Sequence, residues 1–202
     1  EVRVTIPAWA PYSSGLDFAK ARSSWIQQHR AVSPALLKDG QQIGKHHRLH
    51  FVPQNTARVS TRIRPTEVVV NHPIQLDIGH SDIQFAAAKA SIRALRAQAE
   101  KLLPMRLEEL AVLHGLTYRS AGIKQLKSRW GSCDQDKNIT LNLFLMQLPW
   151  QLIDYVLLHE LTHTQVLHHG PKFWRAMEAI EPRTKELRQL IREHRYGNLA
   201  VV

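Results

Sequence analysis

Hydrophobic and polar residues alternate along the first part of the chain, with the period of two that is typical of strands. The segments predicted as strands on this basis are residues 2–6, 43–52, 58–64 and 66–70. Helical spacing of apolar residues predicts one helix among them, over residues 16–28. We therefore expect residues 1–82 to form a strand-rich N-terminal part with one helix.

The pattern then changes to the helical period of about 3.6 residues. Asp82 is placed to cap a helix over residues 83–114, and Gly115 is placed to end it. Pro104 lies inside this helix and predicts a kink or a break, because proline removes one helical hydrogen bond. The inward-facing stripe consists of Ile92, Leu95, Ala99, Leu102, Leu103, Leu107 and Leu110.

Two short segments precede the next helix. Residues 127–133 and 139–143 flank a polar turn, and the alternation in the second segment predicts a half-buried strand, so the two are expected to form a hairpin in a small antiparallel sheet. Pro149 favours the start of a helix after them. From Lys172 onward a further helix is expected, ending before Gly197.

The helix after Pro149 combines a nearly continuous apolar surface with histidine and glutamate. On a helix, His159 and His163 lie one turn apart on one face, so both imidazoles can reach the same ion. Glu160 follows the first histidine, where a carboxylate can reach a metal-bound water without ligating the metal, as in HExxH zinc hydrolases. Since buried polar groups need partners, we interpret this segment as a zinc site rather than a helix with incidental histidines.

A catalytic zinc ion takes a third protein ligand and leaves one position open. His168 and His169 are both candidates, and the chain must turn back after the helix to bring either to the ion. We favour His169 because it adjoins the Gly170-Pro171 turn. The metzincin pattern has a glycine at the position of Val166, which weighs against that class. Three other histidines, His46, His47 and His50, are interpreted as surface residues of a strand.

Charge is the unusual feature of the composition. The 202 residues carry 27 Lys and Arg against 17 Asp and Glu, for a net charge of +10, while the apolar fraction of 44% is ordinary. Two helix faces carry basic stripes, which are Lys89, Arg93 and Arg96, and Lys185, Arg188, Arg192 and Arg195. We interpret them as solvated faces, and the alternative is weak binding to nucleic acid.

The location of the protein is indicated by what the sequence lacks. No apolar run approaches the roughly 20 residues of a membrane span, and the 202 residues show no signal peptide. The single cysteine, Cys133, cannot form an intramolecular disulfide, which fits a cytoplasmic protein. Because the chain starts with Glu1 instead of methionine, we expect a leader or some native N-terminal residues to be missing from this sequence.

Several segments together resemble the YgjP-like family of small zinc metallopeptidases, which is related to the SprT-like proteases. They are Ser128-Arg129-Trp130-Gly131-Ser132-Cys133, Ile139-Thr140-Leu141-Asn142, Ile153-Asp154-Tyr155-Val156, His159-Glu160-Leu161-Thr162-His163 and His169-Gly170-Pro171-Lys172-Phe173-Trp174. The resemblance is densest from Leu126 to Trp174. It implies a zincin-like part at residues 83–202 within an α+β fold. Because the sequence contains no evident linker, we expect this part to pack closely against residues 1–82.

The resemblance also implies roles for individual residues. His159, His163 and His169 would hold Zn²⁺, and Glu160 would be the general base. At the position of His168 the family more often has a polar residue other than histidine. Phe173 and Trp174 would pack against the metal helix, and we favour packing for Trp130 and Cys133 as well.

Other residues are candidates for contacts with substrate or ligands. The candidates for substrate contact are Arg129, Ser132 and Asn142, the first two as oxyanion donors. Asp154 and Glu178 are the candidates for orienting the metal-binding histidines.

These groups predict a zinc-dependent hydrolase in which zinc-activated water attacks a carbonyl or a phosphoryl centre, with Glu160 taking the proton. The resemblance implies that the substrate is a polypeptide. Two alternatives remain open. The kinship with SprT-like proteases and the basic stripes suggest a protease acting on DNA-bound proteins. Hydrolysis of nucleoside triphosphates is the other, since zinc-activated water is not selective by itself and the family carries a suggestion of this activity.

Overall fold

The computed structural model describes residues 5–24 and 36–194, and the chain divides into two compact units, residues 1–35 and 36–202. In the first unit, α1 (Tyr12–Ala21) begins directly after Pro11. It overlaps the helix predicted over residues 16–28 and starts four residues earlier. Residues 25–28 of that prediction, and residues 2–4 of the predicted first strand, lie outside the described residues. Residues 5 and 6 of the predicted first strand are described and are not part of a strand.

The second unit begins with a four-stranded sheet. Its strands are β1 (Gln42–Ile43), β2 (His47–Gln54), β3 (Ser60–Ile63) and β4 (Glu67–Pro73), in the order β1-β2-β4-β3. β2 and β4 are parallel, and the other two pairs are antiparallel. The strands predicted at residues 58–64 and 66–70 are confirmed. The strand predicted over residues 43–52 is divided at Gly44, whose φ of +65° turns the chain.

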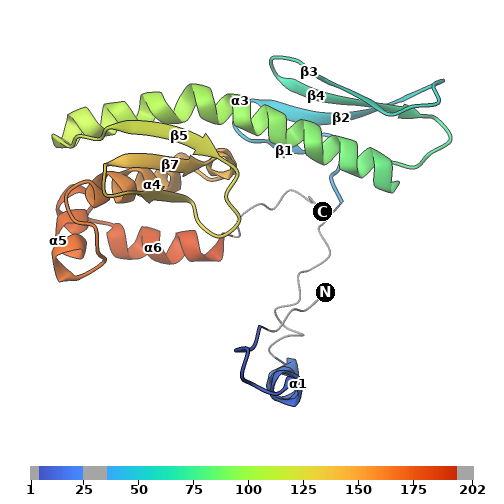
Figure 1. The fold of residues 1–202 in the computed structure, drawn as a ribbon. Helices are drawn as coiled ribbons and strands as arrows, with labels where there is room; N and C mark the ends of the chain where they lie inside the picture. The colour runs from blue at the N-terminus through green and yellow to red at the C-terminus, as the bar shows by residue number, and fades with distance from the viewer. Residues whose placement is uncertain (1–4, 25–35, 195–202) are drawn as a thin grey trace. The chain divides into compact units, whose positions relative to one another are not determined.

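One long helix, α3 (Ser81–His114), connects the two halves of this unit. Figure 1 shows the first sheet along the N-terminal half of α3 and the second sheet along its C-terminal half. The helix ends where predicted, at Gly115 with a φ of +63°, but its N-cap is His80, whose ring accepts a hydrogen bond from the Asp82 amide. It continues through Pro104 without a break. The predicted stripe is buried at Leu95, Ala99, Leu103, Leu107 and Leu110, and Ile92 and Leu102 are partly buried.

His47 is buried, which corrects its interpretation as a surface histidine. This residue is only 7% exposed, and its Nδ1 lies 2.8 Å from Nε2 of Gln98 on α3. The turn at Gly44 lays the start of β2 against α3, and Gln98 binds the main chain of Ile43 and Lys45 there. His46 is exposed, as predicted.

The second sheet consists of β5 (Ser120–Lys124), β6 (Gly131–Cys133) and β7 (Asn138–Asn142), in the order β5-β7-β6. β6 and β7 form the predicted antiparallel hairpin, and the turn between them is held by the Asp134 carboxylate, which accepts from the amides of Asp136 and Asn138. β5 pairs with β7 in parallel, so the sheet is mixed rather than purely antiparallel. The chain runs back along α3 after Gly115, and this places β5 beside β7.

A short 3-10 helix, η1 (Leu143–Gln147), leads into α4 (Trp150–His163), and Pro149 is the N-cap of α4. Two helices come after α4, namely α5 (Pro171–Ile180) and α6 (Thr184–Glu193), where a single helix was predicted. Pro182 lies between them and breaks the helix, because its ring cannot fit a helix interior. Apolar side chains of α3, β7, η1 and α4 join in one core. No helix among the described residues is both long and apolar enough to cross a bilayer.

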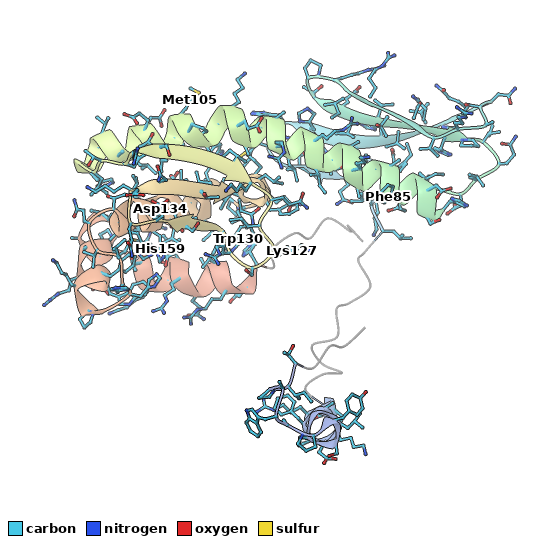
Figure 2. The ribbon with its side chains drawn as sticks, viewed as in Figure 1. Phe85, Met105, Lys127, Trp130, Asp134 and His159 are labelled. Carbon is cyan, nitrogen blue, oxygen red and sulfur yellow. The ribbon has the colours of Figure 1, made fainter. Side chains whose placement is uncertain are left out.

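The predicted α+β class is confirmed. The division of the chain at residue 82 stays a prediction, and β1 to β4 contact α3 across it. Figure 2 shows Trp130 and His159 on the side of the second sheet and α4, away from Phe85 near the start of α3.

Candidate metal centre

Two histidines on α4 face one point because of helix geometry. His159 and His163 are one turn apart, their ring centroids are 4.8 Å apart, and their Nε2 atoms are 3.2 Å apart. Most of the other side chains of α4 from Leu152 onward are buried in the core, which fixes the direction of this face. The helix therefore presents two imidazole nitrogens to one location.

The loop after α4 brings in a third histidine. Its Nε2 atom lies 2.9 Å from that of His159 and 3.0 Å from that of His163. This residue is His169, and Trp174 of α5 holds it by donating its indole N–H to the His169 carbonyl, at 3.1 Å. His168 is exposed and does not belong to this group.

The three histidines fit a metal ion by their donor set. Each neutral imidazole has one protonated nitrogen, and His163 Nδ1 is placed to donate to the Val166 carbonyl at 3.1 Å, which leaves its Nε2 lone pair free. The three Nε2 atoms cannot all be paired by hydrogen bonds among themselves, because a protonated Nε2 cannot accept a hydrogen bond and an unprotonated one cannot donate. Tetrahedral zinc with bonds of about 2.0–2.1 Å would space its ligands by roughly 3.3 Å, close to the observed spacing.

Electrostatics keep these rings neutral. Burial lowers the pKa of His159 to about 3, and the neighbouring His163 and His169 contribute to this lowering. Burial is also the main cause of the lowered pKa of His163 and His169. Neutral imidazole is the form that binds metals.

Phe173 and Trp174 of α5 enclose the histidines. Phe173 is fully buried, with its ring centroid 4.5 Å from that of His163 and 4.9 Å from that of His159. Trp174 stacks on His169 with the rings 25° apart. These contacts agree with the packing role expected for both residues. They limit the orientations open to the imidazoles.

Glu160 lies beside the histidines and is only 4% exposed. Its Oε2 atom is buried and has no hydrogen-bond partner among the described residues. Burial raises the pKa of this carboxyl to about 8, and the charge of Arg129 acts in the opposite direction. An unpartnered buried carboxylate is costly, so its presence indicates a ligand or a reacting group at this place.

Gly131 of β6 is pressed against Glu160. A Cβ atom at position 131 would lie 2.7 Å from Glu160 Oε1 and 2.8 Å from its Cγ, closer than side chains pack. The absence of a side chain at Gly131 is therefore what leaves room for the carboxylate. The sequence contained this glycine within the Arg129–Cys133 segment, but nothing local indicated which residue it faces.

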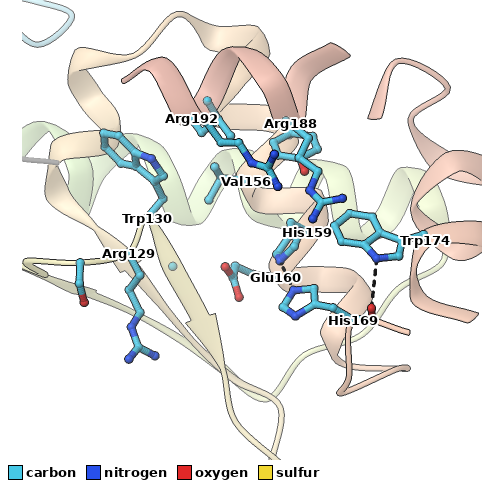
Figure 3. A pocket seen from close by; sticks show the side chains of 13 residues that line it. Arg129, Trp130, Val156, His159, Glu160, His169, Trp174, Arg188 and Arg192 are labelled. Carbon is cyan, nitrogen blue, oxygen red and sulfur yellow. Dashed lines mark hydrogen bonds between the residues drawn. The ribbon is translucent and has the colours of Figure 1, made fainter. Parts of the chain in front are cut away.

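His159, His169 and Glu160 line a cavity of about 630 Å³ (Figure 3). Three arginines line it, which are Arg129 before β6 and Arg188 and Arg192 on α6. Figure 3 shows Arg188 and Arg192 reaching toward His159, with Arg129 on the other side of Glu160. The two α6 arginines were predicted only as part of a solvated stripe, because sequence alone does not show which side of α6 meets α4.

The predicted substrate contacts occupy different surroundings. Arg129 lines the cavity, and Ser132 is half-buried on β6 outside the lining. Asn142 is fully buried, where its amide donates to the carbonyls of Leu126 and Arg129 at 2.9 and 2.8 Å. Asn142 thus holds the segment that carries Arg129, and its amide is already engaged by the main chain.

Neither residue predicted to orient the histidines does so. The Asp154 carboxylate accepts two hydrogen bonds of 2.8 Å from Arg106 of α3, and Glu178 pairs with Lys185 at 3.5 Å. Asp154 is on another side of α4, and His163 uses the Val166 carbonyl instead. For Cys133, burial is the main cause that raises the pKa of its thiol to about 11, in keeping with a packing role.

Comparison with solved structures gives two partial likenesses. The metallopeptidase zymogen abylysin of Pyrococcus abyssi is 26% identical, with a TM-score of 0.42, and the match covers 46% of this chain and 93% of that one. The metallopeptidase zymogen jannalysin of Methanocaldococcus jannaschii is 22% identical, with a TM-score of 0.41, covering 46% and 96%. No curated protein matches the chain. The family description "YgjP-like, metallopeptidase domain" matches residues 1–194, and the chain therefore belongs to the YgjP-like metallopeptidase family.

Proposed function

We propose that this protein is a zinc-dependent peptidase in which His159, His163 and His169 hold the metal and Glu160 is the general base. The observation that carries the proposal is the meeting of three Nε2 atoms, 2.9 to 3.2 Å apart, beside a buried carboxylate that none of the described residues partners. Zinc suits this site because it favours nitrogen ligands in a tetrahedral arrangement.

The roles of the chain's own groups depend on their positions. When bound, a zinc ion acts as a Lewis acid and makes water a nucleophile near neutral pH. Glu160 takes the proton of the attacking water on a carboxylate oxygen and passes it to the leaving amine. Arg129 lines the cavity and is our candidate for stabilising negative charge that develops on the carbonyl oxygen.

Strand β6 is suited to bind an extended peptide. It lies at the edge of the second sheet, where β7 pairs with one side of it, and Gly131 lines the cavity. A substrate strand could add to the other side through main-chain hydrogen bonds, which recognise a polypeptide with little dependence on its sequence.

Zinc-dependent phosphohydrolysis is the second candidate, because three arginines line the same cavity and guanidinium groups bind phosphate well. For recruitment to DNA we find less support. On α3, Arg93 donates to Thr61 and Arg96 pairs with Glu100, so these members of the predicted stripe are engaged within the protein.

The proposal is tested by comparing zinc-loaded wild type with Glu160→Gln over proteins, peptides and nucleotides. We expect peptide cleavage to fall by about 10²- to 10⁴-fold, the usual contribution of a general base, with zinc content unchanged. Glu100→Gln, an exposed carboxylate on α3, serves as the control and keeps full activity. Hydrolysis of nucleotides alone, lost in Glu160→Gln, would favour the second candidate.

A further inference from the structure

The cavity beside the histidines carries an excess of positive charge. Arg129, Arg188 and Arg192 line it, and among the described residues of the lining Glu160 has the single carboxylate. A bound divalent cation would increase this excess. Concave surfaces of one charge concentrate the field, so such a cavity attracts anions.

Arg188 and Arg192 are directed into this cavity by their helix. They are four residues apart on α6 and therefore lie on one face, where like charges repel each other. The Arg188 guanidinium lies 4.1 Å from the centroid of the Trp174 ring, which itself stacks on His169. Arg188 is thus held in place next to the metal centre, and its charge helps to lower the pKa of both His159 and His169.

These two arginines differ from the other basic groups around them. Lys185 on the same helix pairs with Glu178, and Arg183 pairs with Glu181. Arg188 and Arg192 form no ion pair with any residue that the structure describes, and both are exposed to the cavity. Their charges are available to a ligand.

We propose that Arg188 and Arg192 form an anion subsite beside the metal centre, which binds a carboxylate of the peptide substrate. The carboxylate belongs either to an acidic side chain near the scissile bond or to the free C-terminus. This inference rests on the proposed peptidase function. The planar fork of a guanidinium matches a carboxylate through two parallel hydrogen bonds, and the cation–π contact with the Trp174 ring holds the Arg188 guanidinium in place.

The first test uses fluorogenic peptides in matched pairs with zinc-loaded enzyme. In the first set, each pair has Glu or Gln at one position near the cleaved bond. In the second set, each pair has a free C-terminal carboxylate or its amide. We expect wild type to prefer one acidic form, which identifies the source of the carboxylate. Arg188→Gln and Arg192→Gln each lower kcat/KM for that form by roughly 10- to 100-fold, the range for a charged hydrogen bond, and leave the neutral form within about threefold.

Lys185→Gln is the matched control, since it removes a positive charge from the same helix outside the cavity, and it keeps the preference. Equal cleavage of acidic and neutral forms by wild type in both sets overturns the proposal. The same holds if the acidic preference survives in both arginine variants.

Binding of a labelled acidic peptide to Glu160→Gln, measured by fluorescence anisotropy, separates the subsite from the chemistry. The subsite is supported if the acidic peptide binds more strongly than its Gln form and this difference is lost when Arg188 or Arg192 is replaced. If this result is obtained and wild type cuts no peptide, only the peptidase proposal fails. Arginine-dependent binding of ATP without binding of the acidic peptide overturns the proposal in favour of a phosphate site.

Discussion

At the scale of single residues, two neighbours in the sequence can have different roles at the site. His168 and His169 are adjacent and chemically identical, yet only the Nε2 atom of His169 meets those of His159 and His163. The loop that turns back from α4 and the bond from Trp174 to the His169 carbonyl make the difference. The spacing of the histidines left two candidates for the third metal ligand, and the fold places only one of them at the site.

This difference predicts unequal effects of two alanine substitutions. His169→Ala removes one of three nitrogen donors and is expected to lower zinc affinity by at least about 100-fold, since even the groups that only orient metal ligands contribute 10- to 100-fold. His168→Ala is expected to retain zinc as wild type does. Zinc content after dialysis against a chelator, with competition by a fluorescent indicator, measures both. Equal retention by the two variants would contradict the assignment of His169.

A second prediction concerns Gly131. Gly131→Ala places a methyl group 2.7 Å from the Glu160 carboxylate, so the carboxylate must move. Displacement of a reacting group by about 1 Å costs about 10²-fold, and we expect kcat to fall by about 10- to 100-fold with zinc content preserved. Gly122→Ala on β5 is the control, because a Cβ there meets nothing within 4 Å. An unchanged kcat in Gly131→Ala would show that Glu160 is not the base or tolerates the shift.

At the scale of elements, the periodicity of apolar residues predicted helices and hairpins, which are formed by residues close together in the sequence. The stripe from Leu95 to Leu110 identified α3, and the β6-β7 hairpin was predicted from alternation around a polar turn. The parallel pairing of β5 with β7 was missed, because parallel strands are joined through distant connections that leave no local pattern. The prediction of a single C-terminal helix was wrong. The helical spacing of apolar residues continues across Pro182, but the helical backbone is interrupted there.

The link between α3 and α4 supports a prediction of stability. Arg106 binds Asp154 through two hydrogen bonds of 2.8 Å, and these bonds are the largest cause of the raised pKa of the Arg106 guanidinium. Asp154→Asn weakens this pairing and is expected to lower the free energy of unfolding by about 1 kcal/mol, because partial exposure reduces the contribution of a charged pair. This corresponds to a melting temperature lower by about 2–4 °C.

The matched control is Glu109→Gln. Glu109 binds the same guanidinium at 2.8 Å, but its side chain is 60% exposed against 23% for Asp154. The loss of stability in Glu109→Gln is therefore expected to be the smaller. Thermal unfolding monitored by circular dichroism compares the two, and an equal or larger loss in Glu109→Gln contradicts the assigned role of the α3–α4 link.

At the scale of the whole molecule, α3 organises residues 36–194 by contacting both sheets and α4. The cluster of three histidines lies in the half formed by the second sheet and α4 to α6, while the first sheet packs at the other end of α3. The predicted boundary at residue 82 separates the first sheet from α3 in sequence. The strands β1 to β4 nevertheless contact α3 across that boundary, so a strand-rich first part need not be independent of the helix that it packs against.

Local sequence was enough to place His159 and His163 on one face with Glu160 next to them, because helix geometry acts over a single turn. It was also enough for the elements whose periodic patterns are strong. The tertiary structure was needed to bring His169 to the other two histidines, to set Gly131 against Glu160, and to place Arg188 and Arg192 at the border of the cavity. Those contacts join segments that are distant in sequence, and their geometry depends on how the core packs, which no local pattern records.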